Sequence, residues 1–519
     1  MLDAERHFDR RTILKGAAAG GAGLVAGGLL PNPVAVAADS QLPAGALGES
    51  NDLWFARRAW SVSGNRLVAA DEGGPPAVTS LAKAIYRPRS AEEIASIVRA
   101  LPATTAIACV CGGHESSNAA LVADDEAVIL DLGLLKSIEF SHAGEEAVVT
   151  VGAGVVFREL VEAVREQGGA LPVGTGPGVG VVGYLVNGGL SSYFSRRLGL
   201  LGQRVVKMTV VTAAGELRVL TPADASFTAM LGAGSALAIV VDVTLRLAEA
   251  SAIKGAEQRV FGFETREQAV TYSRDAVRFM REQVIPNESV SLEIVVTGTK
   301  AIVVTTVFYD SFDGSPADFV RPLEDLADSM KLPRVAEARW GSWYEAAAAL
   351  WPVIAGQKGT PLATLYHCVG TEGSPDDEVI DFVCDTVVGE APLDEAELSI
   401  VEIRSLGGAA IKGPPIPSGN CRHAFFVDLV TLYDAKGKSR AERQTIVDRT
   451  NQIVDRARTV TGLGVDFSGT HSQPDDIDRT ARAAEIFGTP ALAAAVRAAK
   501  QRLDPGNRLR FHPFAKFLA

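Results

Sequence analysis

The feature that most constrains this chain is the stretch of residues 174–189, in which seven of 16 residues are glycine. Gly178, Gly180 and Gly183 have the spacing of the dinucleotide-binding fingerprint. However, a proline precedes them where a buried strand should end, and Gln203 stands where an acidic residue is needed about 20 residues further on. The stretch contains no Gly-Lys-Ser or Gly-Lys-Thr, so it is not a P-loop. Two interpretations remain: a glycine-lined backbone that binds a flat, extended ligand, or a loop that merely packs.

A second glycine motif follows a predicted strand earlier in the chain. It consists of Gly112, Gly113 and His114, followed by Ser116 and Ser117. Glycines lack a Cβ atom, so their N–H groups can approach a phosphate closely, and serine hydroxyls can add donors. The alternative is that His114 is a turn residue that makes one backbone hydrogen bond.

The length of 519 residues indicates two or three compact units, and a hydrophobic content of 47% is ordinary for globular proteins. Against 62 acidic side chains stand 50 basic ones, which gives a net charge of −12. Binding to a nucleic-acid backbone needs a basic surface, so we expect no nucleic-acid partner.

The sequence pattern predicts an α+β fold. Short apolar runs alternate with turns over residues 50–250, which predicts many short strands. Residues 251–460 contain two rounds of a helix and paired strands, which predicts an antiparallel sheet with helices on one face. The predicted helices cover residues 90–101, 156–167, 265–283, 315–330, 375–388 and 439–460, and the predicted hairpins pair 205–212 with 216–220 and 290–296 with 301–309.

The N-terminus has the pattern of an export signal. Arg10 and Arg11 precede an uncharged run of 15 residues, 16–30, which is shorter than the ~20 residues of a membrane span. Small residues at 35–37 suit a signal peptidase. The pattern resembles a twin-arginine (Tat) signal over residues 1–38, which carries proteins already folded around a cofactor. We therefore expect a secreted or periplasmic protein that meets the Tat machinery and has no stable membrane anchor.

The five cysteines predict neither a disulfide framework nor a metal site. Cys109 and Cys111 are too close in sequence for a usual zinc site, and no second pair with metal spacing follows. Cys368, Cys384 and Cys421 lie in apolar stretches, as is typical of buried cysteines. The sequence leaves open whether a single disulfide forms, because an exported protein can hold one.

Taken in order, the motifs resemble the FAD-binding domain of the vanillyl-alcohol oxidase and p-cresol methylhydroxylase (PCMH) superfamily. The chain looks most like the berberine bridge enzyme-like oxidases and their bacterial relatives, such as 6-hydroxy-D-nicotine oxidase. The resemblance implies a PCMH-type FAD-binding domain over 50–250, a substrate domain over 251–460, and a C-terminal segment, 461–519, that returns to the FAD domain. It rests on residues 112–114, 129–132, 151–154, 171–174, 187–189, 232–234, 239–240, 404–409 and 504–507.

The resemblance further implies a covalently bound FAD. In this family the histidine that matches His114 is bonded to the methyl group on the benzenoid ring of the flavin. Members with a second, cysteine anchor carry it where this chain has Gly176, so we expect one covalent bond. Glu115 replaces a small polar residue and is expected to point away from the pyrophosphate, and Phe467 stands in place of a flavin-contacting tyrosine stretch. The implied cofactor-binding residues are Cys111, Gly112, Gly113, His114, Ser116, Ser117, Gly174, Thr175, Gly178, Val179, Gly180, Gly183, Asn187, Gly188, Gly189, Ile239, Val240 and Asn507.

Catalytic residues are expected on the sheet of the substrate domain, which covers the reacting face of the flavin in this family. Alternation along a strand places Glu402 and Arg404 on one face. Glu402 is a candidate general base, and Arg404 a candidate for holding a carboxylate, the flavin or an oxyanion. The alternative is an ordinary ion pair on an exposed strand face. His423 is a further candidate, and the residue that matches Val179 in related enzymes influences the reaction with dioxygen.

The expected function is that of an FAD-linked oxidase. Such an enzyme removes two electrons from an alcohol, a sugar or an amine-type small molecule and passes them to dioxygen, which gives hydrogen peroxide. Two alternatives remain: a dehydrogenase that uses a quinone or cytochrome acceptor, and a flavin-carrying binding protein without turnover. The sequence does not name the substrate.

Overall fold

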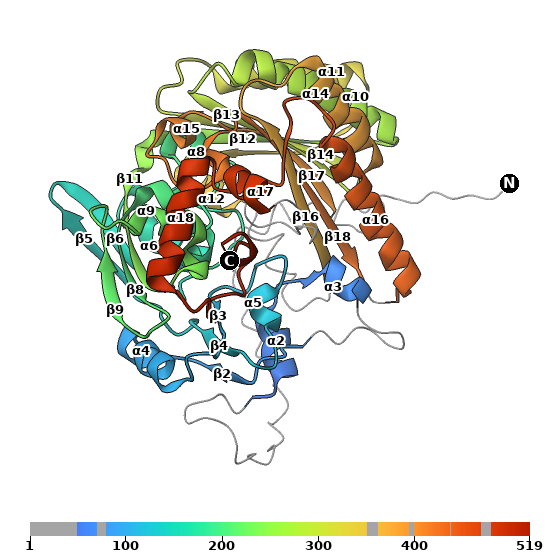
Figure 1. Cartoon of the computed structure of the whole chain (residues 1–519). Helices are drawn as coiled ribbons and strands as arrows, with labels where there is room; N and C mark the ends of the chain where they lie inside the picture. Colours follow the sequence, from blue (N-terminus) through green and yellow to red (C-terminus); the bar gives the residue numbers. More distant parts are fainter. Residues whose placement is uncertain are drawn as a thin grey trace, which may run out of the picture.

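The computed structural model describes residues 49–69, 79–349, 362–393, 399–435, 437–468 and 479–518. The predicted export signal lies outside the described residues. Figure 1 shows two parts, a blue-to-green part with small sheets and a part built on one large sheet.

The blue-to-green part contains two main sheets. Strands β2 (Ala84–Tyr86), β4 (Val128–Asp131) and β3 (Ile107–Val110) pair in parallel in that order. An antiparallel sheet has the order β5 (Ile138–Ala143), β6 (Glu146–Gly152), β10 (Ile239–Arg246), β8 (Val205–Val211) and β9 (Leu217–Leu220). The short strands β7 (Gly169–Ala170) and β11 (Ala248–Glu249) pair separately.

Local sequence signals explain the helices of this part. The Ser90 hydroxyl accepts a hydrogen bond from the Glu93 N–H at 3.2 Å and so caps α4 (Ala91–Ala100). Helix α6 (Phe157–Glu166) turns Leu160 and Val164 into the largest apolar core. These helices and the predicted β8–β9 hairpin are confirmed. The other helices here are α5 (Ala119–Val122), α7 (Val181–Leu185), α8 (Ser195–Leu198) and α9 (Phe227–Ala233).

The second part is one nine-stranded sheet, counted over the described residues. Its order is β1 (Val62–Ser63), β16 (Leu362–Thr371), β18 (Phe425–Asp434), β17 (Ile400–Ser405), β13 (Val290–Thr297), β14 (Ala301–Tyr309), β12 (Ile253–Gly262) and β15 (Arg334–Trp340), while β19 (Gly464–Val465) pairs with β16. All neighbours are antiparallel except β1 and β16. The predicted α+β fold with an antiparallel sheet is confirmed.

Four helices cover the outer face of this sheet (Figure 1). Helices α10 (Arg266–Phe279), α11 (Pro316–Ser329), α14 (Asp377–Asp381) and α16 (Arg440–Ala457) lie there. Apolar side chains from the four helical regions and from the sheet, including Val401, Ile403 and Val427, form one core. Because side chains alternate along a strand, Glu402, Arg404 and their neighbours face the other way, toward the blue-to-green part.

Two of the predicted helices in this region are confirmed and continue as π-helices, whereas three strands were missed. The predicted helix over 265–283 continues past α10 as a π-helix, Met280–Val284, and the one over 375–388 continues past α14 as another, Phe382–Val388. Strands β12, β15 and β16 were not predicted. The short helices α12 (Trp343–Ala348) and α15 (Ala409–Lys412) complete this part.

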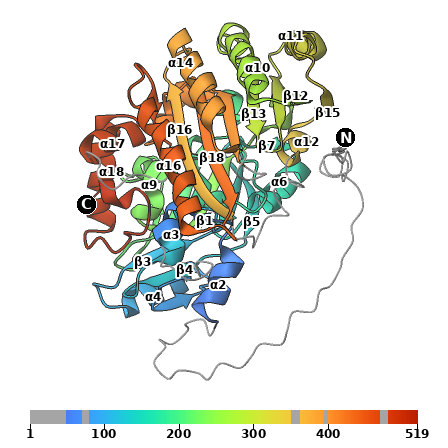
Figure 2. The same cartoon turned by 90° about the vertical axis from the view of Figure 1, so that its right-hand side faces the viewer.

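Both ends of the described chain tie the two parts together. Near the start come α2 (Asn51–Arg58), β1 and α3 (Gly64–Ala69), so the segment runs from the small parallel sheet to the large sheet. Near the end, α17 (Arg479–Ile486) leads to α18 (Pro490–Leu503), which packs against α9 (Figure 2). The Arg508 guanidinium then donates to the Thr105 carbonyl at 2.9 Å. In the described residues, no helix combines the length and the apolar character that a membrane span requires.

Candidate active site

The two glycine motifs meet in the structure. A Cβ atom added to Gly180 would lie 2.6 Å from the Gly112 nitrogen, and one added to Gly112 would overlap the Gly180 nitrogen. Neither position can carry a side chain without moving the backbone. Close packing therefore accounts for these two glycines, as the alternative interpretation held, and it brings the His114 loop to the glycine-rich stretch.

His114 lies at this junction. A Cβ atom on Gly178 would be 3.1 Å from the His114 Nε2 atom, so glycine at 178 leaves room for the imidazole edge. The Trp60 ring stacks on the imidazole, with the ring centroids 5.3 Å apart and the planes 20° apart. The imidazole is thus set between the glycine-rich stretch and the N-terminal segment.

The loop around His114 is held by that N-terminal segment. Gly113 has φ +77°, and a Cβ atom there would overlap the Arg58 carbonyl oxygen, so glycine is required on two grounds. The backbone N–H of Trp60 donates to the Gly113 carbonyl oxygen at 3.3 Å. At the end of the loop, the Asn118 amide donates to the Ser61 carbonyl at 3.0 Å and accepts from the Ser63 N–H at 2.6 Å.

Glu115 folds back onto its own loop. Its carboxylate accepts from the Ser117 N–H at 2.6 Å and from the Ala119 N–H at 2.9 Å. Burial raises the pKa of Glu115, and its hydrogen bonds to the loop oppose that rise. The Glu115 carboxylate therefore already binds the backbone N–H of Ser117, one of the two serines whose hydroxyls the sequence suggested as phosphate donors; the other, Ser116, is buried.

The other glycines of the stretch lie in close contacts. A Cβ on Gly174 would meet Phe157 at 3.0 Å, and one on Gly189, at φ +75°, would meet Leu201 at 2.8 Å. Gly188 is similarly placed against Ser418, whereas the Gly183 position has ordinary room. Thr175 and Val179 are partly exposed at this surface, and the Val179 carbonyl accepts from the Phe157 N–H at 3.0 Å.

The remaining predicted cofactor residues fall into two groups. The side chains of Ile239 and Val240 belong to the core of the blue-to-green part. Asn187 and Asn507, by contrast, each have a buried Oδ1 atom without a hydrogen-bond partner in the described part of the chain. Asn507 also adopts a left-handed turn at φ +49°.

These features fit a polar, extended cofactor such as FAD. Buried polar groups normally have partners, and Trp60 Nε1, Asn187 Oδ1 and Asn507 Oδ1 have none among the described residues. Cys111 lies beside Gly180, and burial raises the pKa of its thiol to about 11, so it stays protonated at neutral pH. All five cysteines lie in described segments and are free thiols.

A buried charge cluster lies on the sheet face opposite the helices. The Arg404 Nε atom donates to Glu293 at 2.8 Å, and the terminal nitrogens donate to Asp428 and Glu402. The Arg404, Glu293 and Asp428 residues are at most 9% exposed. The alternative of an ion pair on an exposed strand face is therefore wrong, and Arg404 is already held by three carboxylates rather than open to a substrate carboxylate.

Asp428 is the unusual acid of this cluster. Burial raises its pKa to about 6, although Arg404 and a hydrogen bond from the Tyr366 hydroxyl favour its charged form. Its Oδ1 atom is buried and has no hydrogen-bond partner among described residues. A carboxylate with a raised pKa and a vacant oxygen is suited to accept a proton near neutral pH.

This cluster faces the glycine-rich stretch. Its charges act on Tyr184, which belongs to α7 inside that stretch. Leu190, just beyond it, packs in an apolar cluster with Phe426 of β18 and with Phe467. The fold thus brings the His114 junction and the Arg404 cluster to facing sides of one region.

Aromatic rings separate His423 from the Arg404 cluster. Its ring stacks on Phe467 with centroids 3.5 Å apart and planes 5° apart, and Phe467 in turn meets the edge of Phe426. Burial lowers the pKa of His423 to about 4, so the ring is neutral at neutral pH. Its Nδ1 atom donates to the Gly419 carbonyl at 2.8 Å. Phe467, in place of the family's tyrosine, therefore acts as a stacking partner.

Four residues of the site escaped the sequence analysis: Trp60, Asn118, Glu293 and Asp428. Asp428 interrupts the apolar run of β18, and this pattern could have identified it, because an acidic residue is rarely buried unless it is paired. No local pattern marks Trp60 as a partner of a histidine 54 positions away.

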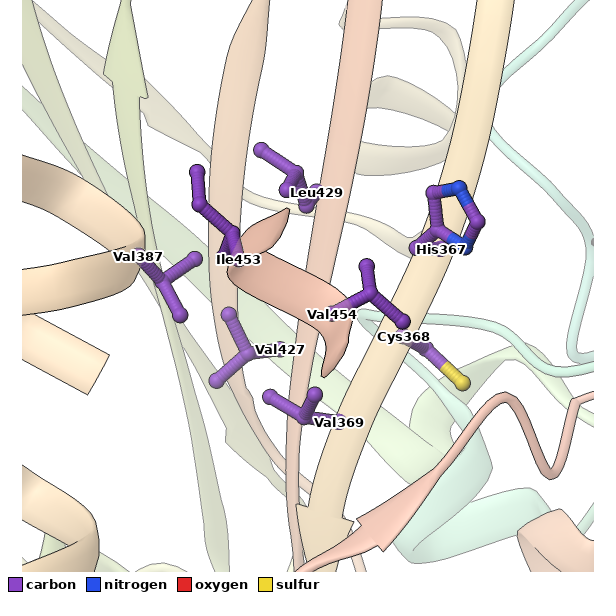
Figure 3. A pocket seen from close by; sticks show the side chains of 8 residues that line it. All are labelled: His367, Cys368, Val369, Val387, Val427, Leu429, Ile453 and Val454. Carbon is purple, nitrogen blue, oxygen red and sulfur yellow. The ribbon is translucent and has the colours of Figure 1, made fainter. Parts of the chain in front are cut away.

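Two hollows in the fold lie elsewhere. One of about 10 Å³, the size of one water molecule, lies under β16 and α16 (Figure 3). Its lining is His367, Cys368, Val369, Val387, Val427, Leu429, Ile453 and Val454. Another of about 250 Å³ lies beside Arg165 and Tyr344. Neither contains a residue of the His114 loop or of the Arg404 cluster.

Comparisons with known proteins find similarity within the first part of the chain. Residues 82–221 match the FAD binding domain family. The chain is 32% identical over 166 residues to the FAD-linked oxidoreductase tazG of Aspergillus terreus, a match that covers 31% of this chain and 33% of that protein. The matched segment thus spans about a third of the length of that curated relative.

Solved structures show the fold over most of the chain. The glucooligosaccharide oxidase of Acremonium strictum, with a 6-S-cysteinyl, 8α-N1-histidyl FAD, has a TM-score of 0.67 at 18% identity and covers 83% of this chain and 91% of that one. The 6-hydroxy-D-nicotine oxidase of Arthrobacter nicotinovorans has a TM-score of 0.64 at 21% identity and covers 83% and 92%. The resemblance read from the sequence is thereby confirmed for the FAD binding domain over residues 82–221, and most of the chain has the fold of these two oxidases.

Proposed function

We propose that the protein is an FAD-dependent oxidoreductase that holds its flavin by one covalent bond to His114 and oxidises an alcohol, a sugar or an amine-type small molecule. The observation that carries the proposal is the position of His114, beside Gly178 at the junction of the two glycine motifs. The histidyl FAD of the Acremonium strictum oxidase supports the bond by analogy. Gly176 in place of a cysteine limits it to one.

Two surfaces of the described chain take part, one in binding the cofactor and one in covering its reacting side. The glycine-rich stretch, with Asn187 and Asn507, holds the cofactor, and the polar face of the large sheet covers the reacting side. This division follows the proposed FAD domain (50–250), substrate domain (251–460) and returning C-terminal segment (461–519). Bound FAD supplies a two-electron acceptor for a hydride from the substrate carbon.

We assign the proton acceptor to Asp428 rather than Glu402. Oxidising a hydroxyl or amine carbon requires a base for the O–H or N–H proton. Both carboxylates accept a hydrogen bond from Arg404, but Asp428 also has a vacant, buried oxygen and a pKa raised to about 6, whereas Glu402 lies at the rim of the cluster. Arg404 orients both carboxylates, and His423, being neutral and set behind Phe467, does not take part directly.

The proposed acceptor of the electrons is dioxygen, with hydrogen peroxide as product. Val179 stands between Gly178 and Gly180, so only one small side chain occupies this part of the glycine surface. The Tat-like N-terminus adds the proposal that the folded, flavin-loaded protein is exported to the periplasm or the medium.

Purified protein tests the proposal directly. Denatured wild-type protein should keep flavin fluorescence on a gel, and His114→Ala should lose it. A panel of alcohols, sugars and amines should bleach the yellow colour and release peroxide. Bleaching without peroxide would favour the dehydrogenase, absence of bleaching under the whole panel would favour a binding protein, and fluorescence kept in His114→Ala would contradict the assigned bond.

A further inference from the structure

We propose that Trp60 is the positioning residue for flavin attachment: its indole ring holds the His114 imidazole in the orientation from which the bond to FAD forms. The inference rests on the proposed covalent bond and goes beyond it. Its basis is the stacked contact between the two rings, with centroids 5.3 Å apart and planes inclined by 20°.

An imidazole needs such support because it can rotate about its Cα–Cβ and Cβ–Cγ bonds. The neighbouring glycines, Gly112, Gly113 and Gly178, have no side chains that could pack against the face of the ring. The Nε2 edge of the ring lies beside Gly178, which has no Cβ atom to contact it. The face of the ring is instead covered by Trp60, and an offset stack of this kind restricts rotation about the Cβ–Cγ bond.

Trp60 can position another ring because its own backbone is fixed on both sides. Before it, the Trp54 indole donates to the buried Asp131 carboxylate at 3.0 Å, and Arg58 forms an ion pair with the same carboxylate at 3.1 Å. After it, Asn118 binds Ser61 and Ser63.

The same segment reaches both parts of the fold. Ser63 also pairs with Thr364 of the large sheet through β1. The backbone N–H of Trp60 donates a hydrogen bond to the carbonyl oxygen of Gly113, the residue before His114. The backbone segment that carries Trp60 is thus attached to the small parallel sheet, to the large sheet and to the His114 loop.

The attachment step depends on this geometry. A ring nitrogen of His114 must approach the flavin methyl carbon along its lone pair, and small errors in position slow such reactions strongly. Overall, one imidazole N–H and one methyl C–H are replaced by a C–N bond. Two protons and two electrons pass to dioxygen, which becomes hydrogen peroxide.

The test measures attachment rather than turnover. Full-length flavin-free protein is produced in a riboflavin-limited host and mixed with FAD in air. Samples are denatured at intervals, and the covalent fraction is read from flavin fluorescence on a gel, while total bound FAD is measured before denaturation. Trp60→Ala should slow covalent attachment at least about tenfold while still binding FAD.

Two matched variants separate positioning from folding. Trp60→Phe keeps an aromatic ring and should restore attachment to within about threefold of wild type, whereas Trp340→Phe, a change in β15 at the edge of the large sheet opposite β1, should leave the rate unchanged. If Trp60→Ala does not fold, as judged by thermal unfolding, Trp60→Leu replaces it, because leucine fills volume without stacking.

The results distinguish this inference from the proposed function. Attachment at the wild-type rate in the non-aromatic variant, or a Trp60→Phe protein as slow as that variant, overturns the role of ring stacking. Failure of the wild type to form a denaturation-resistant bond, or a bond that survives His114→Ala, instead overturns the proposed function.

Discussion

Replacing Asp428 by asparagine should have opposite effects on stability and activity. Burial raises the pKa of Asp428 from 3.8 to about 6 in the folded chain, despite the neighbouring Arg404. The ionised carboxylate is therefore disfavoured by folding by about two pKa units, or about 3 kcal/mol. Asp428→Asn keeps the shape of the side chain and removes this charge.

The pH dependence gives the sign of the stability effect. Between pH 3.8 and about 6 the folded chain keeps the Asp428 proton that the unfolded chain loses, so wild-type stability falls as pH rises through this window. The penalty is complete above about pH 6. Asparagine does not titrate, so the stability of Asp428→Asn relative to wild type should improve by up to about 3 kcal/mol between roughly pH 4 and roughly pH 7.5.

Urea unfolding of both proteins at the two pH values measures this difference, and stopped-flow reduction of the flavin by substrate measures the activity. We expect Asp428→Asn to slow flavin reduction at least about a hundredfold, the usual loss for a missing general base. Glu402→Gln is the control, because it removes a carboxylate of the same cluster that does not have the vacant buried oxygen. A stability difference that is the same at both pH values would refute the electrostatic reasoning, and an unchanged reduction rate would refute the assignment of the base.

Three further predictions test the glycine surface, the oxygen reaction and export. Gly178→Ala places a Cβ atom 3.1 Å from the His114 Nε2 atom, so we expect the covalent flavin fraction on denaturing gels to fall several-fold, and an unchanged fraction would show that the imidazole moves freely. Val179→Leu adds bulk to the glycine surface and should slow flavin reoxidation by dioxygen at least about tenfold, or ~1.4 kcal/mol of barrier, with flavin reduction little changed, as measured by stopped flow. Normal reoxidation in that variant would contradict the role of this position. Replacing Arg10 and Arg11 by Lys should trap active, flavin-loaded precursor inside the cell, which fractionation and peroxide assay would detect, and normal secretion would point to the general export pathway.

Features that depend on neighbours in the chain were predicted well. The Ser90 cap needs only the amide three residues further on, and the β8–β9 hairpin needs only a short turn ending in Gly215, at φ +80°. The two glycine motifs could also be recognised, because their spacing along the chain carries the resemblance. The α+β fold followed from such local patterns, which act before any long-range contact forms.

The site itself was predicted only in part. The sequence identified His114, Glu402 and Arg404 as residues to examine, but it could not decide whether Arg404 was exposed. That depended on Glu293, 111 positions away, and on the pairing of β17 with β13 and β18. Register between strands is fixed by the whole sheet, so the three carboxylates around Arg404 are a property of the fold.

By itself, the sequence identified the two glycine motifs and placed Glu402 and Arg404 on one face of their strand, because these features depend on residue type and local spacing. Only the tertiary structure decided which surfaces meet. It stacked Trp60 on His114, it showed that Gly112 and Gly180 are needed for packing between two segments, and it raised the pKa of Asp428 by removing water from its carboxylate. Burial and contact between distant segments are set by the packing of the complete chain, and no stretch of the sequence contains them.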